Sequence, residues 1–508
     1  MARRTIVGTM VQARLSPTSL EWGVDALLIL ALVNLLIVFF SEGYDLSFGP
    51  MRLEVHHIGN PLLLLLAFGI AKGWLRGMNT GGTIATRLRS PLLFFLAIVF
   101  IYSLPGRALV SGDNVPARYL PLSLLREFNL DLDEFRFLYE PEVPYFLQAR
   151  NGHIVSAYPP WAAVVALPVY LLPVLGGVSP QSPRLLELEQ LAATLMTALS
   201  ALILLFALRR LTHEKIAWWI ALIYALGTSS YSESSGSLGQ HGSSQLFLTL
   251  ALYCLVRGRD EPRFTAYAGC MLASAIIARP LNLLIALPIG AYILHRCRDQ
   301  LLGFLLAMLP PLALGMTYND YYFGSPFTTG IASAAVSPVS FVTTFSVGFS
   351  TPLLEGLLGI LVSPGRGLLI YSPILLCSFV AIAMVWRRSD QLLLKYLSFG
   401  PFLLILLIAK WKMWWGGFTY GPRLLADVTP ILCLYLYVPL ELSERRALLR
   451  YTLVGLAILS VGMHVLGVFS DGSWNVNPTS VDRHPERLWS WIDNPPVYYG
   501  SKILAKFR

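Results

Sequence analysis

Long apolar runs recur along the whole 508-residue chain and limit what it can fold into. Runs of about 16 to 22 residues are long enough to cross ~30 Å of hydrocarbon as helices. Lipid offers the backbone no hydrogen-bond partners, and the runs lack the polar–apolar alternation of membrane strands. The sequence therefore predicts an all-α polytopic membrane protein. Thirteen transmembrane helices are expected, at 24–40, 60–75, 90–105, 187–208, 216–232, 243–257, 265–279, 281–295, 301–317, 368–386, 392–409, 424–441 and 450–469.

Basic residues are distributed in a way that orients the chain. Seven turns that fall on one side each carry at least two Lys or Arg, whereas segments 233–242 and 318–350 on the other side carry none. Because cytoplasmic loops carry the excess of positive charge, the seven turns are predicted to be cytoplasmic. They are 1–23, 76–89, 209–215, 257–264, 296–300, 387–391 and 442–449. We therefore expect a multi-pass protein of the plasma (inner) membrane with a cytoplasmic N-terminus. The net charge of +9 comes mostly from these short turns, so no nucleic-acid partner is expected.

Three segments are expected from this pattern. Residues 1–89 are predicted to form a two-helix membrane hairpin, 90–469 the main transmembrane domain, and 470–508 an extracytoplasmic tail. In the main domain, 106–160 is a long polar outer loop. The apolar runs after it and at 351–361 are too short to span comfortably, and are expected as re-entrant or juxtamembrane helices. The five cysteines lie in or at the ends of apolar runs, so neither a disulfide framework nor a metal spacing is predicted.

Several cations are placed against the charge bias, near the outer ends of helices. Charges at such positions are costly enough that they usually mark partners or function. Snorkelling of single side chains to lipid headgroups is the alternative explanation. A group of cations beside a glycine turn favours a bound phosphate, because guanidinium contacts phosphate oxygens at two points. The candidates for this donor phosphate site are Arg279, Arg366, Lys410, Lys412 and Arg423.

Acidic residues of the long outer loop are candidates for a catalytic base. Asp113, in the motif SGDN just past the third expected helix, could accept a proton from an incoming hydroxyl at the membrane boundary. The alternative is a turn-forming aspartate, because Asp favours such turns. Asp131, Asp133 and Glu134 form a denser cluster that is more typical of a solvated face.

Three further residues of the outer segments are candidates for substrate contacts. Glu140 and Glu142 belong to the same outer loop as Asp113. His241 lies between glycines in the next outer turn, where it could contact the phosphate or the sugar or have a purely structural role. The sequence contains no HExxH pattern, so no metal site is predicted, and a divalent cation held by loop carboxylates stays open.

Seven short motifs follow one another in a fixed order. They are SGDN, VPARYLPLSLLREF, NGHIVSAYPPW, GQHGSSQLF, YNDYYFGSPFTTG, SPGRGLLIYSP and WWGGFTYGPRLL. Over roughly residues 90–500 this order resembles the GT-C membrane glycosyltransferases, which include protein O-mannosyltransferases and the aminoarabinose transferases of lipid A. Asp113 stands at the position of the family's acidic residue, and Arg118 adds a cation near the expected donor. Tyr158, which together with Glu140 and Glu142 is a candidate of the substrate loop, stands where relatives carry a Lys or His before the Pro-Pro pair.

The resemblance implies a GT-C-like bundle and a function. The expected partners are a polyprenyl-phosphate sugar donor, membrane lipids, and an acceptor that is a glycan, glycolipid or protein. The sugar would be transferred at the outer face, with Asp113 as the base. The alternative is a transporter or a flippase for lipid-linked sugars, which would favour broken helices in matched pairs and an inverted repeat.

Overall fold

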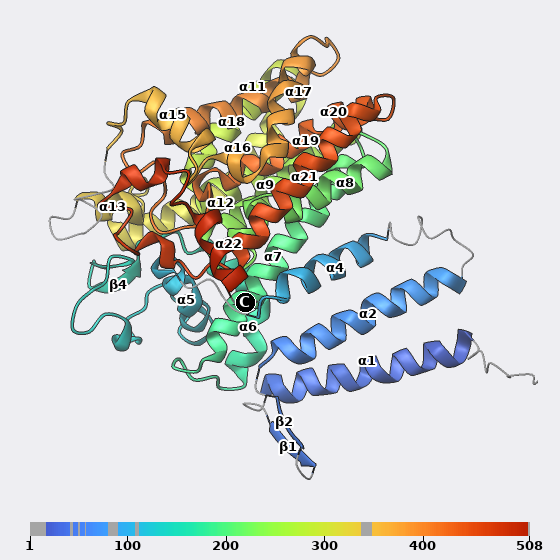
Figure 1. Cartoon of the computed structure of the whole chain (residues 1–508). Helices are drawn as coiled ribbons and strands as arrows, with labels where there is room; N and C mark the ends of the chain where they lie inside the picture. Colours follow the sequence, from blue (N-terminus) through green and yellow to red (C-terminus); the bar gives the residue numbers. More distant parts are fainter. Residues whose placement is uncertain are drawn as a thin grey trace, which may run out of the picture. The chain divides into compact units, whose positions relative to one another are not determined.

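The computed structural model describes residues 17–40, 44–48, 51–55, 57–79, 90–106, 111–336 and 348–505 (Figure 1). The chain divides into two compact units, Met1–Phe100 and Ile101–Arg508. The predicted N-terminal segment falls within the first unit, and the predicted C-terminal tail folds as part of the second.

The first unit consists mainly of two helices joined by a β-hairpin. Its elements are α1 (Pro17–Phe40), β1 (Tyr44–Phe48), β2 (Met51–Val55) and α2 (Gly59–Asn79), followed by most of α4 (Pro91–Ser103). The two long helices pack against each other and match the first two predicted spans. β1 pairs antiparallel with β2, and Tyr44 pairs with Val55 in the register. Lys72 of α2 forms an ion pair with Asp25 of α1, so each of these two charges has a partner on the neighbouring apolar helix.

The second unit is a helical bundle with one small β-hairpin. Its helices are α5 (Val115–Arg126), α6 (Trp161–Leu175), α7 (Arg184–Leu208), α8 (Glu214–Leu226), α9 (Gln240–Arg257), α10 (Arg263–Ala278), α11 (Leu283–Arg296), α12 (Arg298–Phe323), α13 (Gly330–Val336), α15 (Leu353–Val362), α16 (Leu368–Tyr371), α17 (Leu376–Trp386), α18 (Leu392–Lys410), α19 (Thr429–Tyr435), α20 (Tyr437–Ser443), α21 (Ala447–Val468) and α22 (Pro495–Ala505). The hairpin pairs β3 (Leu147–Arg150) with β4 (His153–Ser156) in antiparallel register. Helix α10 packs extensively against α9 and α12, and α7 against α9.

Within the described residues, five helical segments are long and apolar enough to cross a membrane. They are Arg184–Leu208, Arg298–Phe323, Leu392–Lys410, Arg423–Ser443 and Ala447–Val468. This agrees with a mostly helical, multi-pass membrane protein, whereas the number thirteen stays a prediction. Several predicted spans form shorter or broken helices instead, because proline removes a backbone donor. Pro430 and Pro439, for example, lie where one predicted span becomes a 3₁₀ turn followed by two short helices.

The two short apolar runs are helical, as expected. α6 has 15 residues with Pro168 and Pro173 inside, and α15 has 10 residues. Their predicted re-entrant placement in a membrane stays a prediction.

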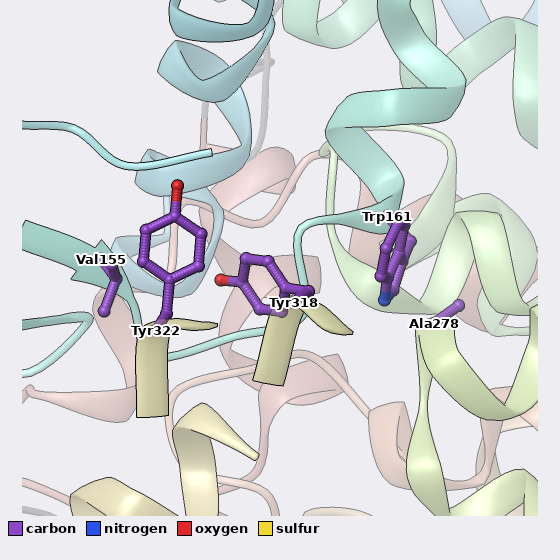
Figure 2. Close-up of a cluster of buried hydrophobic side chains, with 5 residues drawn as sticks. All are labelled: Val155, Trp161, Ala278, Tyr318 and Tyr322. Atoms are coloured by element: carbon purple, nitrogen blue, oxygen red, sulfur yellow. The ribbon is translucent and has the colours of Figure 1, made fainter. Parts of the chain in front are cut away.

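A buried cluster of five side chains anchors the long predicted outer loop to the bundle (Figure 2). Val155 comes from β4 and Trp161 from the start of α6, and they pack with Ala278 of α10 and with Tyr318 and Tyr322 of α12. The short chain between Val155 and Trp161 is therefore fixed at both ends.

Candidate active site

Asp113 and Arg423 form an ion pair although they are far apart in the sequence. Arg423 Nη1 donates to Asp113 Oδ2 at 2.9 Å, and each side chain is 18% exposed. Asp113 lies in a 3₁₀ turn just before α5, and Arg423 begins the 3₁₀ turn before α19. Arg423 Nη2 also donates to the carbonyl of Gly416 at 2.8 Å, so the glycine turn helps to orient the guanidinium. The structure thus brings together the predicted base and one of the predicted phosphate contacts.

Two tyrosines complete the surroundings of the Asp113 carboxylate. The hydroxyls of Tyr158 and Tyr145 donate to Oδ1 at 2.7 and 3.0 Å. Burial raises the pKa of Asp113, but the Arg423 guanidinium and the two phenol hydrogen bonds outweigh burial, so the pKa lies below its ordinary value. Burial, followed by the nearby Asp113 charge, raises the pKa of both tyrosines. Asp113 is therefore an ionised carboxylate held by protonated phenols.

Tyr158 owes its position to the anchored chain between Val155 and Trp161. Sequence reasoning placed Tyr158 in the substrate loop but did not predict its contact with Asp113. Tyr145 had no sequence signal beyond its place in the same loop.

A cavity of about 240 Å³ lies beside this ion pair. Arg423 lines it, together with Ser111 and Asn114 on either side of Asp113. His241, at the start of α9, also lines the cavity, and its Nδ1 atom is buried without a hydrogen-bond partner among the described residues. Since His241 is only 8% exposed, a ligand in the cavity is a natural partner for that nitrogen.

Glu233 is a cavity residue that sequence reasoning missed. It lies in the π-helical turn Ser230–Ser234, and its Oε1 accepts from the hydroxyl of Thr419 at 2.7 Å and the backbone N–H of Tyr420 at 2.8 Å. Its other oxygen has no hydrogen bond to the described part of the chain. Burial raises the pKa of Glu233, against the opposing effect of Arg423. The available signal was that Glu233 is the one acidic residue of segment 233–242, which carries no Lys or Arg.

The C-terminal segment forms another wall of the cavity. Ser470, Asp471, Gly472 and Asn475 all contribute to the lining. Asp471 is paired with Lys502 of α22 at 2.5 Å, so this wall is tied to the last helix.

Two of the predicted phosphate-binding arginines are buried with protein partners. Arg279 is 3% exposed, forms an ion pair with Asp427 and donates to the carbonyl of Leu424. Arg366 is 1% exposed. Its nitrogens donate to the carbonyls of Trp415, Gly365 and Gly417 and to the side chain of Asn475, at 2.7 to 3.1 Å. Neither arginine lines the cavity, and a phosphate contact for either stays a prediction.

The other predicted residues lie outside the cavity lining. Arg118 Nε donates to Glu189 at 2.6 Å, and Glu189, which is fully buried, also accepts from the backbone of Leu238. This pair thus connects α5, α7 and the turn before α9. Lys410 is half-buried at the end of α18, and Lys412 is exposed. The carboxylates of Glu140 and Glu142 are exposed as well.

Asp131, Asp133 and His153 are the three residues that could hold a metal ion among those the structure describes. His153 Nδ1 is 2.8 Å from Asp133 Oδ2 and 3.5 Å from Asp131 Oδ2, and the three ligand atoms lie within 4.8 Å of one another. Two carboxylates and an imidazole are suitable ligands for a divalent cation such as zinc. The neighbouring Glu134 instead accepts a hydrogen bond from Ser123.

Comparison with known proteins gives similarity to solved structures only. No family model and no curated protein matches the chain. Among solved structures, the chain is similar to the crystal structure of ArnT from Cupriavidus metallidurans bound to undecaprenyl phosphate. The TM-score is 0.47 at 14% identity, over 80% of this chain and 74% of that chain. A similarity at this level does not identify a family, so the chemistry has to be inferred from the site itself.

Proposed function

We propose that the protein is a GT-C-type glycosyltransferase that moves a sugar from a polyprenyl phosphate to a hydroxyl of an acceptor at the outer face of the membrane. The observation that carries the proposal is the Asp113–Arg423 pair beside a cavity. A base and a phosphate-binding cation are the two groups that this reaction needs close together. The acceptor is a glycan, a glycolipid or a protein.

The reaction is a displacement at the anomeric carbon. The acceptor oxygen forms a bond to that carbon, and the bond from the carbon to the phosphate oxygen breaks with its electrons going to the phosphate. The acceptor proton passes to Asp113, which is ionised and therefore able to receive it. Polyprenyl phosphate leaves as an anion and needs little protonation, so one base and nearby cations suffice.

Both oxygens of Asp113 have partners, so an incoming hydroxyl has to replace one of them. Tyr145 is the partner that can give way, because its side chain is 39% exposed and its hydrogen bond is the longer of the two phenol contacts. Tyr158 is fixed by the buried chain on either side of it and keeps the carboxylate in place.

Arg423 stabilises the charge that develops on the phosphate. Its Nε is buried and has no hydrogen-bond partner in the described ranges, so it can still donate to a ligand. His241, which also lines the cavity, provides a second contact, and Glu233 has one carboxylate oxygen left for a hydroxyl of the sugar. Together these groups surround a small polar ligand rather than the polyprenyl chain.

Transfer by purified full-length protein in proteoliposomes tests the proposal. A panel of polyprenyl-phosphate hexoses and pentoses is supplied with total envelope lipid and glycan as acceptors, and release of polyprenyl phosphate is measured. Asp113→Asn should reduce release about 10²- to 10⁴-fold, the usual contribution of a general base.

The matched control is Asp260→Asn, since Asp260 pairs with Arg210 in a turn far from Asp113 in the sequence. That variant should retain the wild-type rate. Undiminished release by Asp113→Asn would remove Asp113 from the mechanism. Movement of the intact lipid-linked sugar across the bilayer, without its cleavage, would favour the flippase alternative.

A further inference from the structure

A second cavity, of about 450 Å³, lies where four inter-helix turns meet. Its lining comes from the turn between α7 and α8, the turn after α9, the junction of α11 with α12, and the turn before α18. Each of these turns was predicted to lie on the cytoplasmic side because of its basic residues. The proposed active site makes no use of this cavity.

The two cavities lie at opposite ends of the same helices. Gly239 and His241 at the start of α9 line the first cavity, and Gly258 and Arg259 just after its end line the second. α9 has 18 residues, which gives a helix about 27 Å long. α18 likewise starts at the second cavity and ends at Lys410, shortly before Phe418, Thr419 and Tyr420, which line the first. This separation is close to the thickness of a bilayer core.

The second cavity has a surplus of positive charge. Arg259 and Arg296 both line it, and neither forms an ion pair or a hydrogen bond with the described residues. Asp390 is the one carboxylate in the lining, and Gln391 donates a hydrogen bond to it. Two guanidinium groups against one carboxylate leave the cavity with a net positive charge.

Neutral donors in the lining suit the same kind of ligand. The hydroxyl of Tyr292 and the amide of Gln300 lie in the wall. The long helices α12 and α18 both begin at this cavity, with backbone N–H groups that have no partner within the helix. Helix N-termini and guanidinium groups are both favourable for anions, and phosphate is the anion that guanidinium contacts best.

Topology alone explains why basic residues occur on this side of the protein. It requires only that they lie on the correct side of the membrane, and charges spread over the surface would satisfy it. It does not explain why two unpaired arginines from different turns line one cavity between two helix N-termini.

We propose that this second cavity binds a phosphate group, carried either by an anionic lipid headgroup or by a free phosphate compound. The inference is independent of the proposed transferase activity, because it concerns other residues at the other end of the bundle. Exposed apolar side chains of Leu294 and Leu302 flank the lining residues in the sequence, and a lipid headgroup entering from the bilayer would contact them.

Native mass spectrometry of the full-length protein in detergent tests the proposal. One arm titrates phosphatidylglycerol, with phosphatidylcholine as the neutral-headgroup comparison, and the other arm titrates inorganic phosphate. The variant Arg259→Gln/Arg296→Gln should bind the phosphate-bearing ligand at least about tenfold more weakly than the wild type, given about 1 kcal/mol per basic residue. Both arginines are exposed, so the variant is expected to fold, and thermal unfolding verifies this.

The control variant is Arg445→Gln/Arg446→Gln, which removes the same charge from another predicted cytoplasmic turn that does not line the cavity. It should bind like the wild type. Loss of phosphatidylglycerol binding only in the cavity variant identifies a lipid headgroup, and loss of inorganic phosphate binding identifies a free phosphate ligand. Equal binding by wild type and cavity variant in both arms, or equal loss in both variants, would overturn the proposal.

Discussion

Two Arg–Asp pairs in the bundle have the same chemistry and different surroundings. The Asp113–Arg423 pair is partly exposed beside a cavity, whereas in the Asp427–Arg279 pair the side chains are 0% and 4% exposed. Asp427 also accepts from Ser244 at 2.8 Å, and Ser244 accepts from Asn282 at 2.7 Å. The enclosed pair therefore belongs to a network of protein groups alone.

The difference shows which charges are available for chemistry. A cation that is buried with a protein carboxylate away from the cavity contributes to folding and specificity, whereas one with a free donor beside the cavity can meet a ligand. Sequence position did not distinguish them, because Arg279 and Arg423 both lie at an end of an expected transmembrane helix and both lie next to a proline.

The largest effect on stability is expected from breaking the enclosed pair. Asp427→Ala leaves the buried Arg279 charge without its partner and should cost about 3–5 kcal/mol of the free energy of unfolding. Asp113→Asn should cost clearly less, because Arg423 keeps its bond to Gly416 and contact with the cavity. Unfolding in mixed micelles with increasing SDS, followed by tryptophan fluorescence, compares the two. Equal losses would mean that the Asp113 pair is structural as well.

Among the basic residues, substitution of Arg423 is expected to lower the transfer activity most. Arg423→Gln removes the charge beside the departing phosphate and should lower transfer about 10²- to 10³-fold, the usual effect of losing one such stabilising group. Arg279→Gln should instead reduce the yield of folded protein. Initial rates of donor cleavage, normalised to folded protein, separate the two variants. An Arg423→Gln enzyme with the wild-type rate would contradict the role given to this guanidinium.

A pair of buried histidines extends the comparison to neutral side chains. His464 has both ring nitrogens within 2.8 Å of serine hydroxyls, Ser232 and Ser372, whereas Nδ1 of His241 is left unpartnered at the cavity. His241→Ala should raise the KM for the donor about tenfold, as expected for one lost hydrogen bond to a charged ligand. His464→Ala should lower stability and leave that KM unchanged. Steady-state kinetics over a range of donor concentrations test both outcomes.

The sequence predicted the class of protein and part of the site. Apolar runs are a property of the chain itself, so they indicated a helical membrane protein without any knowledge of packing. Asp113 and Arg423 could be suspected individually, because each is a charge next to an apolar run. Their contact, together with the Tyr158 and Tyr145 hydrogen bonds, depends on how the predicted outer loop packs against the bundle, which residue spacing does not encode.

The sequence did not predict the surroundings of Arg366 and Glu233, and the physical reason is the same for both. Arg366 is basic and follows a glycine, as a phosphate contact would, yet the backbone carbonyls around it use all three of its nitrogens. Glu233 lies in a serine-rich turn that gave no sign of burial. In both residues the role follows from the number of hydrogen-bond partners, and most of those partners come from distant parts of the chain.

The two tyrosines that donate to Asp113 differ in exposure, as the two ion pairs do. Comparing them tests which tyrosine positions the base, and the expected effects are the smallest. Removing the Tyr158 hydroxyl weakens the stabilisation of the carboxylate, so Tyr158→Phe should raise the pKa of Asp113. The protonated form then persists to higher pH, and the acid limb of kcat/KM should move to higher pH.

The lowered pKa of Asp113 also predicts how the stability of the protein depends on pH. The pKa of Asp113 is lowered on folding, so its contribution is present above the pKa of the unfolded chain and is lost as the pH falls through the folded value. Tyr158→Phe should reduce this contribution, and thermal unfolding of the variant and wild type over the acid range measures it. Tyr145→Phe should change kcat/KM less than about threefold, because this exposed phenol has to leave when the acceptor binds. A larger loss with Tyr145→Phe than with Tyr158→Phe would reverse the assignment and make Tyr145 the residue that positions the base.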